Sequence, residues 1–462
     1  MSELISTIAT GVWTPVLFLL ILGGLFFFFY SRLIHYRYIT HCIAVLRGKY
    51  HDPNDPGQIS PYEALSTALA STVGMGNIAG VAAAISLGGP GALFWMWVTA
   101  FIGMSTNFFT STLSVMYRGK DSEGEIQGGP MYVIREALGK AWMPLAGLFC
   151  VCCMVGCLPI FQANQLTQAI IDIGISSPEA RAWTLPILGF EVNALKFIIG
   201  IVLTIISGVV IIGGIQRIGS WAGKMVPLMI ILYFFSVVAI LIVHIDAVPG
   251  YLWMIISDAF VGLNSHASPA LGGIVGGLIV AGVRRASFSN EAGIGTAPMA
   301  LGASQSKEPI REGLVSMMSP AIDTLLVCTL TALAILVTGA WKSDTNGVTM
   351  TALAFESSLG DTGKYLLLLC AFFFAITSLF SYSYYGSKAL SFLVGVKASK
   401  YYDYIYLSTI VLGAVSSMAD VINVIDIAYA LMAVPTMLSG LVLAPKVLAE
   451  AKSYFSRMKG NM

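Results

Sequence analysis

The stretch that decides the fold is Ser71-Thr-Val-Gly-Met-Gly-Asn-Ile-Ala-Gly80. It lies in an apolar segment of about 20 residues, the length that an α-helix needs to cross a membrane. Glycine inside a helix costs about 1 kcal/mol relative to alanine, and Ser, Thr and Asn side chains compete for backbone hydrogen bonds. The stretch therefore predicts a break in a membrane-spanning helix. Close helix packing through small residues is the alternative interpretation.

A second stretch of the same character is Arg285-Ala-Ser-Phe-Ser-Asn-Glu-Ala-Gly-Ile-Gly-Thr-Ala-Pro298. It shares the pattern Asn-x-Ala-Gly with the first stretch, at Asn77–Gly80 and Asn290–Gly293. The two stretches lie five apolar segments apart, which is typical of an inverted repeat whose halves each begin with a discontinuous helix. Because irregular backbone at membrane depth must line a cavity, we expect the two breaks to meet near the midplane.

Composition indicates an all-α, multi-spanning integral membrane protein. Of the 462 residues, 56% are hydrophobic and 11% are charged, whereas a soluble domain carries about 25% charged residues. Much of the surface must therefore face membrane lipid, and a net charge of +1 argues against nucleic acid as a ligand. We predict eleven spans, near residues 13–31, 63–86, 91–117, 143–172, 195–213, 223–243, 268–301, 313–339, 363–393, 403–418 and 424–448.

Basic residues orient these spans. With the N-terminus outside, the predicted inner loops carry twenty Lys and Arg residues and the outer loops carry four. This bias predicts a plasma (inner) membrane protein with a cytoplasmic C-terminus. The remaining cation, Lys388, is expected to snorkel to the inner surface. No Lys or Arg precedes Trp13, so we interpret the first apolar segment as a retained helix and not a signal peptide. The seven cysteines are expected to be reduced and buried.

Six motifs in order give the chain a resemblance to a known family. They are Ser71–Gly80, Gly88-Gly-Pro-Gly-Ala-Leu-Phe-Trp-Met-Trp-Val98, Gly128-Gly-Pro-Met-Tyr132, Phe288-Ser-Asn-Glu-Ala-Gly293, Arg311-Glu-Gly-Leu-Val315 and Asp323-Thr324. Together they resemble the alanine/glycine:cation symporter family over residues 60 to 440. The resemblance implies a LeuT-type five-plus-five inverted repeat (63–243 and 268–448) behind an extra N-terminal helix (13–31). It also implies coupling to Na+, with H+ as the alternative, and alanine or glycine as the substrate.

Two positions depart from the family pattern. Met75 stands where members often have Thr between the two glycines, and Tyr382 stands where a Trp is common. Both positions are near the substrate pocket that the resemblance implies. A different neutral amino acid, such as serine or glutamine, therefore stays open as the substrate, as does an uncoupled facilitator or channel.

The first break is the expected site for the carboxylate of a small neutral amino acid. Its residues are Gly74, Met75, Gly76 and Asn77. The outer half of the broken helix begins there, so its free amides form a positive helix N-terminus. At the second break, the carbonyls of Phe288, Ser289 and Asn290 are expected to accept from the substrate ammonium, with Phe288 capping the pocket.

Gln162 and two hydroxyls complete the candidate site. Gln162 resembles a family segment that lines the substrate site, and interhelical hydrogen bonding is the alternative. Thr377 and Ser378, with the carbonyls of Ala70 and Val73, resemble the Na+ site general to the fold. Oxygen ligands suit a hard cation. Alternatively, the two hydroxyls bond to the preceding helical turn.

Two carboxylates fall within predicted spans. An ionisable residue at this depth is a functional candidate. Glu291 either is protonated, pairs with Arg284 or Arg285, or serves transport. Asp323 is either a hydrogen-bond hub or a coupling group. No P-loop or hydrolase motif occurs, so we expect neither an enzyme nor an organic cofactor.

Overall fold

The computed structural model describes residues 2–175, 177–187, 190–260, 274–416 and 418–460. The described chain is mostly helical, as predicted. Two short antiparallel hairpins accompany the helices. Their strands are β1 (Gly119–Lys120) with β2 (Ile126–Gln127), and β3 (Thr184–Ile187) with β4 (Phe190–Asn193).

The first half of the chain carries the extra helix and the first broken helix. Its helices are α1 (Ser2–Tyr30), α2 (Ile34–Arg37), α3 (Ile39–Leu46), α4 (Pro61–Thr72), η1 (Gly76–Gly80), α5 (Val81–Gly88), α6 (Ala92–Met116), α7 (Pro130–Val133), η2 (Ile134–Leu138), η3 (Lys140–Trp142), α8 (Met143–Gly156), α9 (Ile160–Gly174), α10 (Pro178–Ala182), α11 (Ala194–Ile211) and α12 (Gly214–Val243). The predicted break falls between α4 and η1.

The second half carries the second broken helix. Its helices are α13 (Val248–Asp258), α14 (Ile274–Asn290), α15 (Thr296–Leu301), α16 (Pro309–Ser316), α17 (Met318–Pro320), η5 (Ala321–Cys328), α18 (Thr329–Val337), η6 (Ala340–Lys342), α19 (Gly347–Val394), α20 (Val396–Val415) and α21 (Met418–Gly460). Helix α19 is interrupted by a kink at Gly360, where φ is +64°. The ninth predicted span, which begins at residue 363, corresponds to the part of α19 after this kink.

The predicted spans correspond to helices, but their number stays a prediction. Within the described residues, eight helices are long and apolar enough to cross a membrane. A ninth span arises when the bent pair Pro61–Thr72 and Gly76–Gly88, which meet at 48°, is counted as one. Residues 268–273 of the seventh predicted span and residue 417 of the tenth lie outside the described chain.

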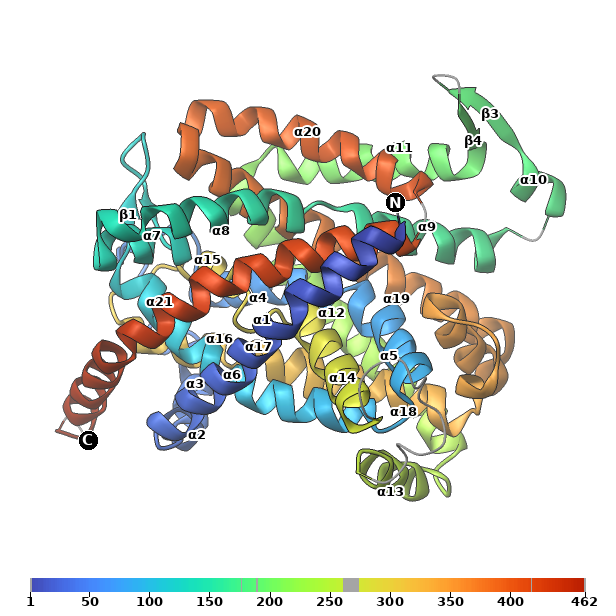
Figure 1. Ribbon diagram of the computed structural model, residues 1–462, viewed down its shortest axis with the longest axis horizontal. Helices are drawn as coiled ribbons and strands as arrows, with labels where there is room; N and C mark the ends of the chain where they lie inside the picture. The colour runs from blue at the N-terminus through green and yellow to red at the C-terminus, as the bar shows by residue number, and fades with distance from the viewer. Residues whose placement is uncertain (1, 176, 188–189, 261–273, 417, 461–462) are drawn as a thin grey trace.

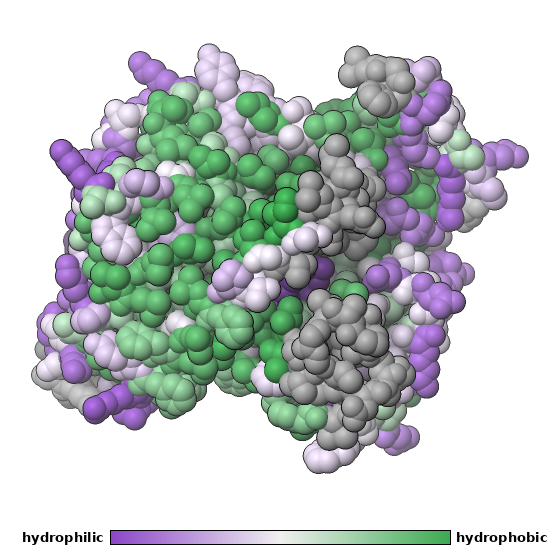
Figure 2. Space-filling view, in the orientation of Figure 1, coloured by the Kyte–Doolittle hydropathy of each residue, from purple (hydrophilic) through white to green (hydrophobic). Residues whose placement is uncertain are grey.

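Helices α1 and α21 pack side by side and cross one face of the molecule (Figure 1). Behind them, α4 packs against α12, α15 and α19, while α14 packs against α5 and α6. The two broken helices therefore lie in the interior. Large apolar side chains are exposed on the outer helices, including Phe18, Ile205 and Ile242 at 60–65% exposure. Figure 2 shows this hydrophobic surface over α1 and α21, as expected for helices that face lipid.

Lys388 corrects one expectation. Its side chain is buried and does not snorkel to the surface. The ammonium Nζ donates to the Met299 carbonyl at 3.1 Å and to Tyr384 Oη at 2.7 Å. These partners come from α15 and from the preceding turn of α19, so Lys388 ties the second broken helix to α19. All seven cysteines are buried and unbridged.

Candidate functional site

The first break is a short non-helical turn whose amides are met by side chains. Helix α4 starts with a capping box between Ser60 and Glu63 and ends before Val73, whose ψ of 87° leaves the helical region. The Gly74 amide donates to Asn77 Oδ1 at 2.8 Å, and the Met75 amide donates to Gln162 Oε1 at 2.9 Å. The structure thus brings Gln162 to the expected carboxylate site, where its side-chain carbonyl accepts a hydrogen bond from one of the backbone amides.

Of the two glycines in this turn, Gly74 and Gly76, only Gly74 has neighbouring atoms too close to admit a Cβ. A Cβ on Gly74 would lie 2.5 Å from Ser378 Oγ and 3.0 Å from Gln162 Nε2. A Cβ on Gly76 would lie 3.8 Å from the Phe288 ring, which is an ordinary contact. Only Gly74 is therefore required by the packing of this break onto α9 and α19.

The second break lies slightly later in the chain than expected. Phe288, Ser289 and Asn290 form the last turn of α14, and the non-helical segment runs from Glu291 to Gly295. Glu291, Gly293 and Gly295 have φ values of +54°, +85° and +113°. Glycine adopts such values without the steric cost of a Cβ. The break therefore forms where the two glycines are, and the preceding residues stay helical.

Glu291 receives hydroxyl groups from four helices. Its buried carboxylate accepts from Tyr382 Oη at 2.7 Å, Tyr429 Oη at 3.3 Å and Ser71 Oγ at 3.5 Å. Thr296 donates as well, at short range. Because Ser71 belongs to α4, this carboxylate joins the two broken helices. Tyr429 and Thr296 were missed in the sequence, and only Thr296 is close enough along the chain to have been a signal.

Arg284 does not pair with Glu291. Its guanidinium forms an ion pair with the buried carboxylate of Asp426 in α21. Arg285 lies instead with its guanidinium carbon 5.8 Å from the centre of the Phe288 ring. The predicted pairing of Glu291 with either arginine is thus absent from the described structure, and the hydroxyl groups take its place.

Asp323 is a second buried carboxylate that connects the breaks. Its oxygens accept from Asn77 Nδ2 at 2.6 Å, Ser289 Oγ at 3.0 Å and Thr324 Oγ1 at 2.6 Å. Asn290 also reaches this region, donating to Thr324 Oγ1 at 3.1 Å. Asp323 therefore forms the hydrogen-bond hub that was one of its two expected roles.

Aromatic rings close the space beside the first break. The Phe288 ring lies edge-on to Phe161 at 5.1 Å and to Tyr429 at 5.5 Å between ring centres. Tyr382 lies on the other side of this group, with its hydroxyl 3.0 Å from that of Tyr429. Most of the expected substrate-binding residues thus gather around one buried region. Asn164, two residues after Gln162 in α9, instead donates to the carbonyls of Gly413 at 3.2 Å and Ser416 at 2.7 Å.

The two candidate Na+ hydroxyls have different surroundings. Ser378 Oγ lies against Gly74 of the first break and donates to the Phe374 carbonyl at 3.0 Å. Thr377 Oγ1 donates to the Phe373 carbonyl at 2.9 Å and lies 3.4 Å from Met229 Sδ in α12. Ser378 is therefore brought to the break that holds the Ala70 and Val73 carbonyls. The Thr377 hydroxyl faces its own helix and α12.

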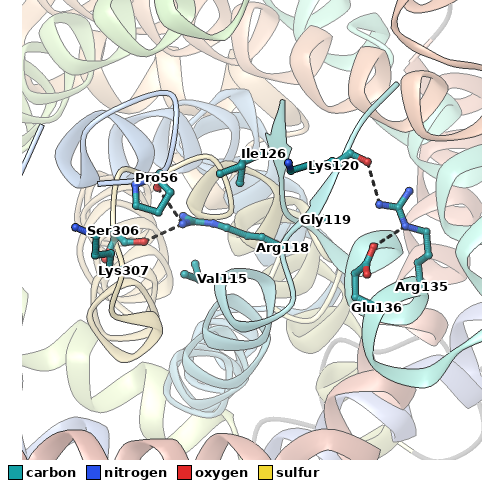
Figure 3. A pocket seen from close by; sticks show the side chains of 10 residues that line it. All are labelled: Pro56, Val115, Arg118, Gly119, Lys120, Ile126, Arg135, Glu136, Ser306 and Lys307. Carbon is teal, nitrogen blue, oxygen red and sulfur yellow. Dashed lines mark hydrogen bonds and ion pairs between the residues drawn. The ribbon is translucent and has the colours of Figure 1, made fainter. Parts of the chain in front are cut away.

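One end of both broken helices is held by Arg118, at the end of α6. Its guanidinium donates to the carbonyls of Gly302 at 2.9 Å, Ser306 at 2.8 Å and Pro56 at 3.1 Å. Figure 3 shows this side chain reaching between Pro56 and Ser306. The segment before α4 and the segment after α15 are thereby joined.

Comparison with known proteins agrees with this architecture. The profile of the sodium:alanine symporter family matches residues 1–462. The chain is 34% identical to the sodium/alanine symporter AgcS of Methanococcus maripaludis, over 98% of this chain and 97% of that protein. It is 31% identical to the probable sodium/glutamine symporter GlnT of Bacillus subtilis, over 97% and 90% of the two chains.

The fold is also found among solved structures. The crystal structure of MhsT in complex with L-phenylalanine superposes with a TM-score of 0.58 at 14% identity. The match covers 86% of this chain and 93% of MhsT. It confirms the LeuT-type fold. With two broken helices meeting at a buried polar centre and a family match over its whole length, this chain belongs to the sodium:alanine symporter family.

Proposed function

We propose that this protein is a secondary active transporter that carries a small neutral amino acid, alanine or glycine, into the cell together with Na+. The observation that carries the proposal is the contact of Gln162 Oε1 with the Met75 amide, 2.9 Å away. A substrate carboxylate takes the place of this side-chain carbonyl, because an anion is a stronger acceptor for an amide at a helix N-terminus.

The remaining contacts orient and select the substrate. The carbonyls at the end of α14, from Phe288 to Asn290, accept from the substrate ammonium. The aromatic group around Phe288 lies beside this break and favours a substrate with a short side chain, and Met75 adds an apolar wall. Glutamine is the competing substrate, because one relative carries the name of a probable sodium/glutamine symporter. One methylene of misfit is worth about 10–200-fold in selectivity.

Sodium is the proposed coupling ion. Ser378 and Thr377 supply hydroxyl oxygens, and Ala70 and Val73 supply carbonyls from the first break. Thr377 Oγ1 faces its own helix and Met229 in the structure, so it would need another rotamer to reach a Na+ ion at the break. Because the ion and the carboxylate share this break, binding of one orders the site for the other. Protons are the alternative coupling ion, with Glu291 as the group that would carry one.

The transport direction rests on the proposed topology. The first helix is α1, and the inverted repeats begin at α4 and α14. The excess of basic residues in the predicted inner loops supports a cytoplasmic C-terminus in a protein of the plasma membrane. Tags at the two ends, read from intact and permeabilised cells, test this orientation. A tag at the C-terminus that is accessible in intact cells contradicts it.

Uptake into proteoliposomes tests the function. We expect labelled alanine to accumulate above its external concentration only with an inward Na+ gradient, and glycine to compete best. Equilibration without accumulation would indicate a facilitator. Best competition by glutamine would leave symport intact but overturn the small-substrate assignment.

The double variant Thr377→Val, Ser378→Ala tests the ion site. We expect it to lower the apparent Na+ affinity at least tenfold while the protein folds normally. An unchanged Na+ dependence contradicts this site. Accumulation driven by a proton gradient alone would make H+ the coupling ion.

A further inference from the structure

A pocket of about 710 Å³ lies at one end of the molecule, between α3, the start of α16 and the end of α21. Four cations from three distant segments line it: Arg37, Lys49, Arg311 and Arg457. The C-terminal end of α21 and the α2–α3 segment lie at the same end of the molecule (Figure 1). The pocket is therefore a product of the tertiary structure and not of one basic stretch.

Positive charge in this pocket is largely unmatched. Among the described residues, the one carboxylate in its lining is that of Glu308, whose Oε2 lies 3.0 Å from Arg457 Nη2 and forms an ion pair with it. In the described part of the chain, no carboxylate forms an ion pair with Arg37, Lys49 or Arg311. An anion that enters the pocket thus meets three uncompensated cations.

In the basic pocket of Figure 3, most of the cations are engaged by other protein groups. There, Arg118 is used by backbone carbonyls, as described above. Arg135 pairs with Glu136 at 2.8 Å, and Lys307 pairs with Asp55 at 2.5 Å. Lys120, which also lines that pocket, forms no ion pair among the described residues. The two pockets therefore differ in how many of their cations are engaged by protein groups: three of four in the pocket of Figure 3, and one of four as an ion pair in the first pocket.

Arg311 is positioned in advance for a ligand. Its guanidinium lies 4.7 Å from the centre of the Tyr50 ring, its Nε donates to Tyr454 Oη at 3.1 Å, and its Nη1 donates to the Tyr50 carbonyl at 3.4 Å. Among the described residues, none forms a hydrogen bond with the Nη2 group, and Arg311 lines the pocket. A guanidinium held in this way suits the oxygens of a phosphate.

His41, which also lines the pocket, is affected by the same positive charges. Its Nε2 lies 2.7 Å from Tyr454 Oη. Burial, together with the charges of Arg311 and Lys49, lowers the pKa of His41. The positive charges of the arginine and the lysine thus reach this part of the pocket, and they favour an anion there.

The surface next to the pocket is apolar. At the adjacent end of α1, the side chains of Phe26, Phe29 and Leu33 are 41%, 70% and 39% exposed. The surface over α1 and α21 is hydrophobic, and hydrophilic residues border it (Figure 2). A ligand with a charged head and hydrocarbon chains matches both surfaces at once, and a free anion matches only one.

We propose that this pocket binds the phosphate group of an anionic phospholipid, whose acyl chains lie along α1. Basic pockets at the membrane interface bind such headgroups through charge and hydrogen bonds. The site is separate from the substrate site, and it depends only on the protein being in a membrane. A lipid headgroup and a free phosphate ion would both bind here through phosphate oxygens.

Native mass spectrometry of the purified full chain in detergent tests the proposal. Phosphatidylglycerol is titrated, and the dissociation constant of the first bound lipid is measured. The test variant is Arg37→Gln, Lys49→Gln, because both side chains are exposed and make few protein contacts. The matched control is Lys397→Gln, Lys400→Gln, which removes two exposed cations outside the pocket.

Each removed pocket cation is expected to weaken lipid binding about fivefold, so the test variant should lose roughly 25-fold and the control less than twofold. Equal losses in both variants would mean diffuse surface charge and would overturn the site. Equal binding of phosphatidylcholine, which has no net charge, would also overturn it.

Inorganic phosphate distinguishes the two sources of the anion. We expect millimolar phosphate not to displace phosphatidylglycerol, because the acyl chains add apolar contacts. If phosphate displaces the lipid and the affinity does not depend on acyl-chain length, the assignment to a lipid is overturned and the pocket binds a soluble phosphate. Arg311→Lys, which keeps the charge but loses the planar donor pair, should also weaken lipid binding.

Discussion

The two helix breaks have the same place in the two halves of the chain, but they are built differently. None of the residues from Val73 to Asn77 has a left-handed backbone, and side chains from Asn77 and Gln162 meet the exposed amides. The second break has three left-handed residues and a buried carboxylate. The first break is therefore held by contacts that a ligand can replace, whereas the second is set by its backbone and its buried carboxyl group.

The largest expected effect is on the second break. Gly295 has φ of +113°, and a Cβ there would lie 2.6 Å from both Phe149 and Thr436. Gly295→Ala should therefore lower the free energy of unfolding by about 2–5 kcal/mol, from backbone strain and overpacking together. Thermal unfolding in detergent measures it. Gly147→Ala is the control, because that position is open and helical. Equal stability of the two variants would show that the backbone of this break is not rigid.

The charge of the second break should matter next. Glu291→Gln keeps the shape of the side chain but replaces one acceptor oxygen by an amide NH2 donor. The hydroxyls around Glu291 donate to its oxygens in the structure, so one of those oxygens would be lost as an acceptor. We expect the free energy of unfolding to fall by about 1.5–3 kcal/mol, the range for hydrogen bonds to a charged group. Alanine uptake should fall in parallel. A variant as stable and active as the wild type would indicate that Glu291 is protonated in the resting protein.

The first break should respond in binding more than in stability. Gly74→Ala places a methyl group against Ser378 and Gln162, while Gly76→Ala makes only an ordinary contact with Phe288. Overpacking of about 1–3 kcal/mol predicts at least a fivefold loss of apparent Na+ and alanine affinity for Gly74→Ala. Gly76→Ala should change either affinity less than threefold. The opposite ranking of these two variants, measured by uptake, would contradict the packing described here.

The smallest expected effects on stability are those of removing the hydroxyl group of Tyr382 or of Tyr429, the two tyrosines around Glu291. Tyr382 Oη lies 2.7 Å from the carboxylate and Tyr429 Oη lies 3.3 Å from it. Tyr382→Phe should cost about 1 kcal/mol in unfolding free energy and Tyr429→Phe less than that, because the longer hydrogen bond is weaker. Thermal unfolding of both variants, with Tyr404→Phe as an exposed control, ranks them. Equal losses would mean that the two hydroxyls act as one unit.

Several features of this protein follow from the sequence alone. Hydropathy identifies a helical membrane protein, and the clusters of Gly, Ser and Asn identify both breaks within a few residues. These features are local, because helix formation and lipid exposure depend on side chains near one another in the chain. The six motifs also led to the correct family, through residues that are read directly from the sequence.

Contacts between helices were decided only by the tertiary structure. Examples are the Gln162 contact with Met75, the hydroxyls that Tyr382 and Tyr429 direct at Glu291, and the burial of Lys388. In a helix that is apolar on most faces, hydropathy does not specify rotation about the helix axis. That rotation follows from packing against neighbouring helices, and it determines which polar side chain meets which partner across tens or hundreds of residues.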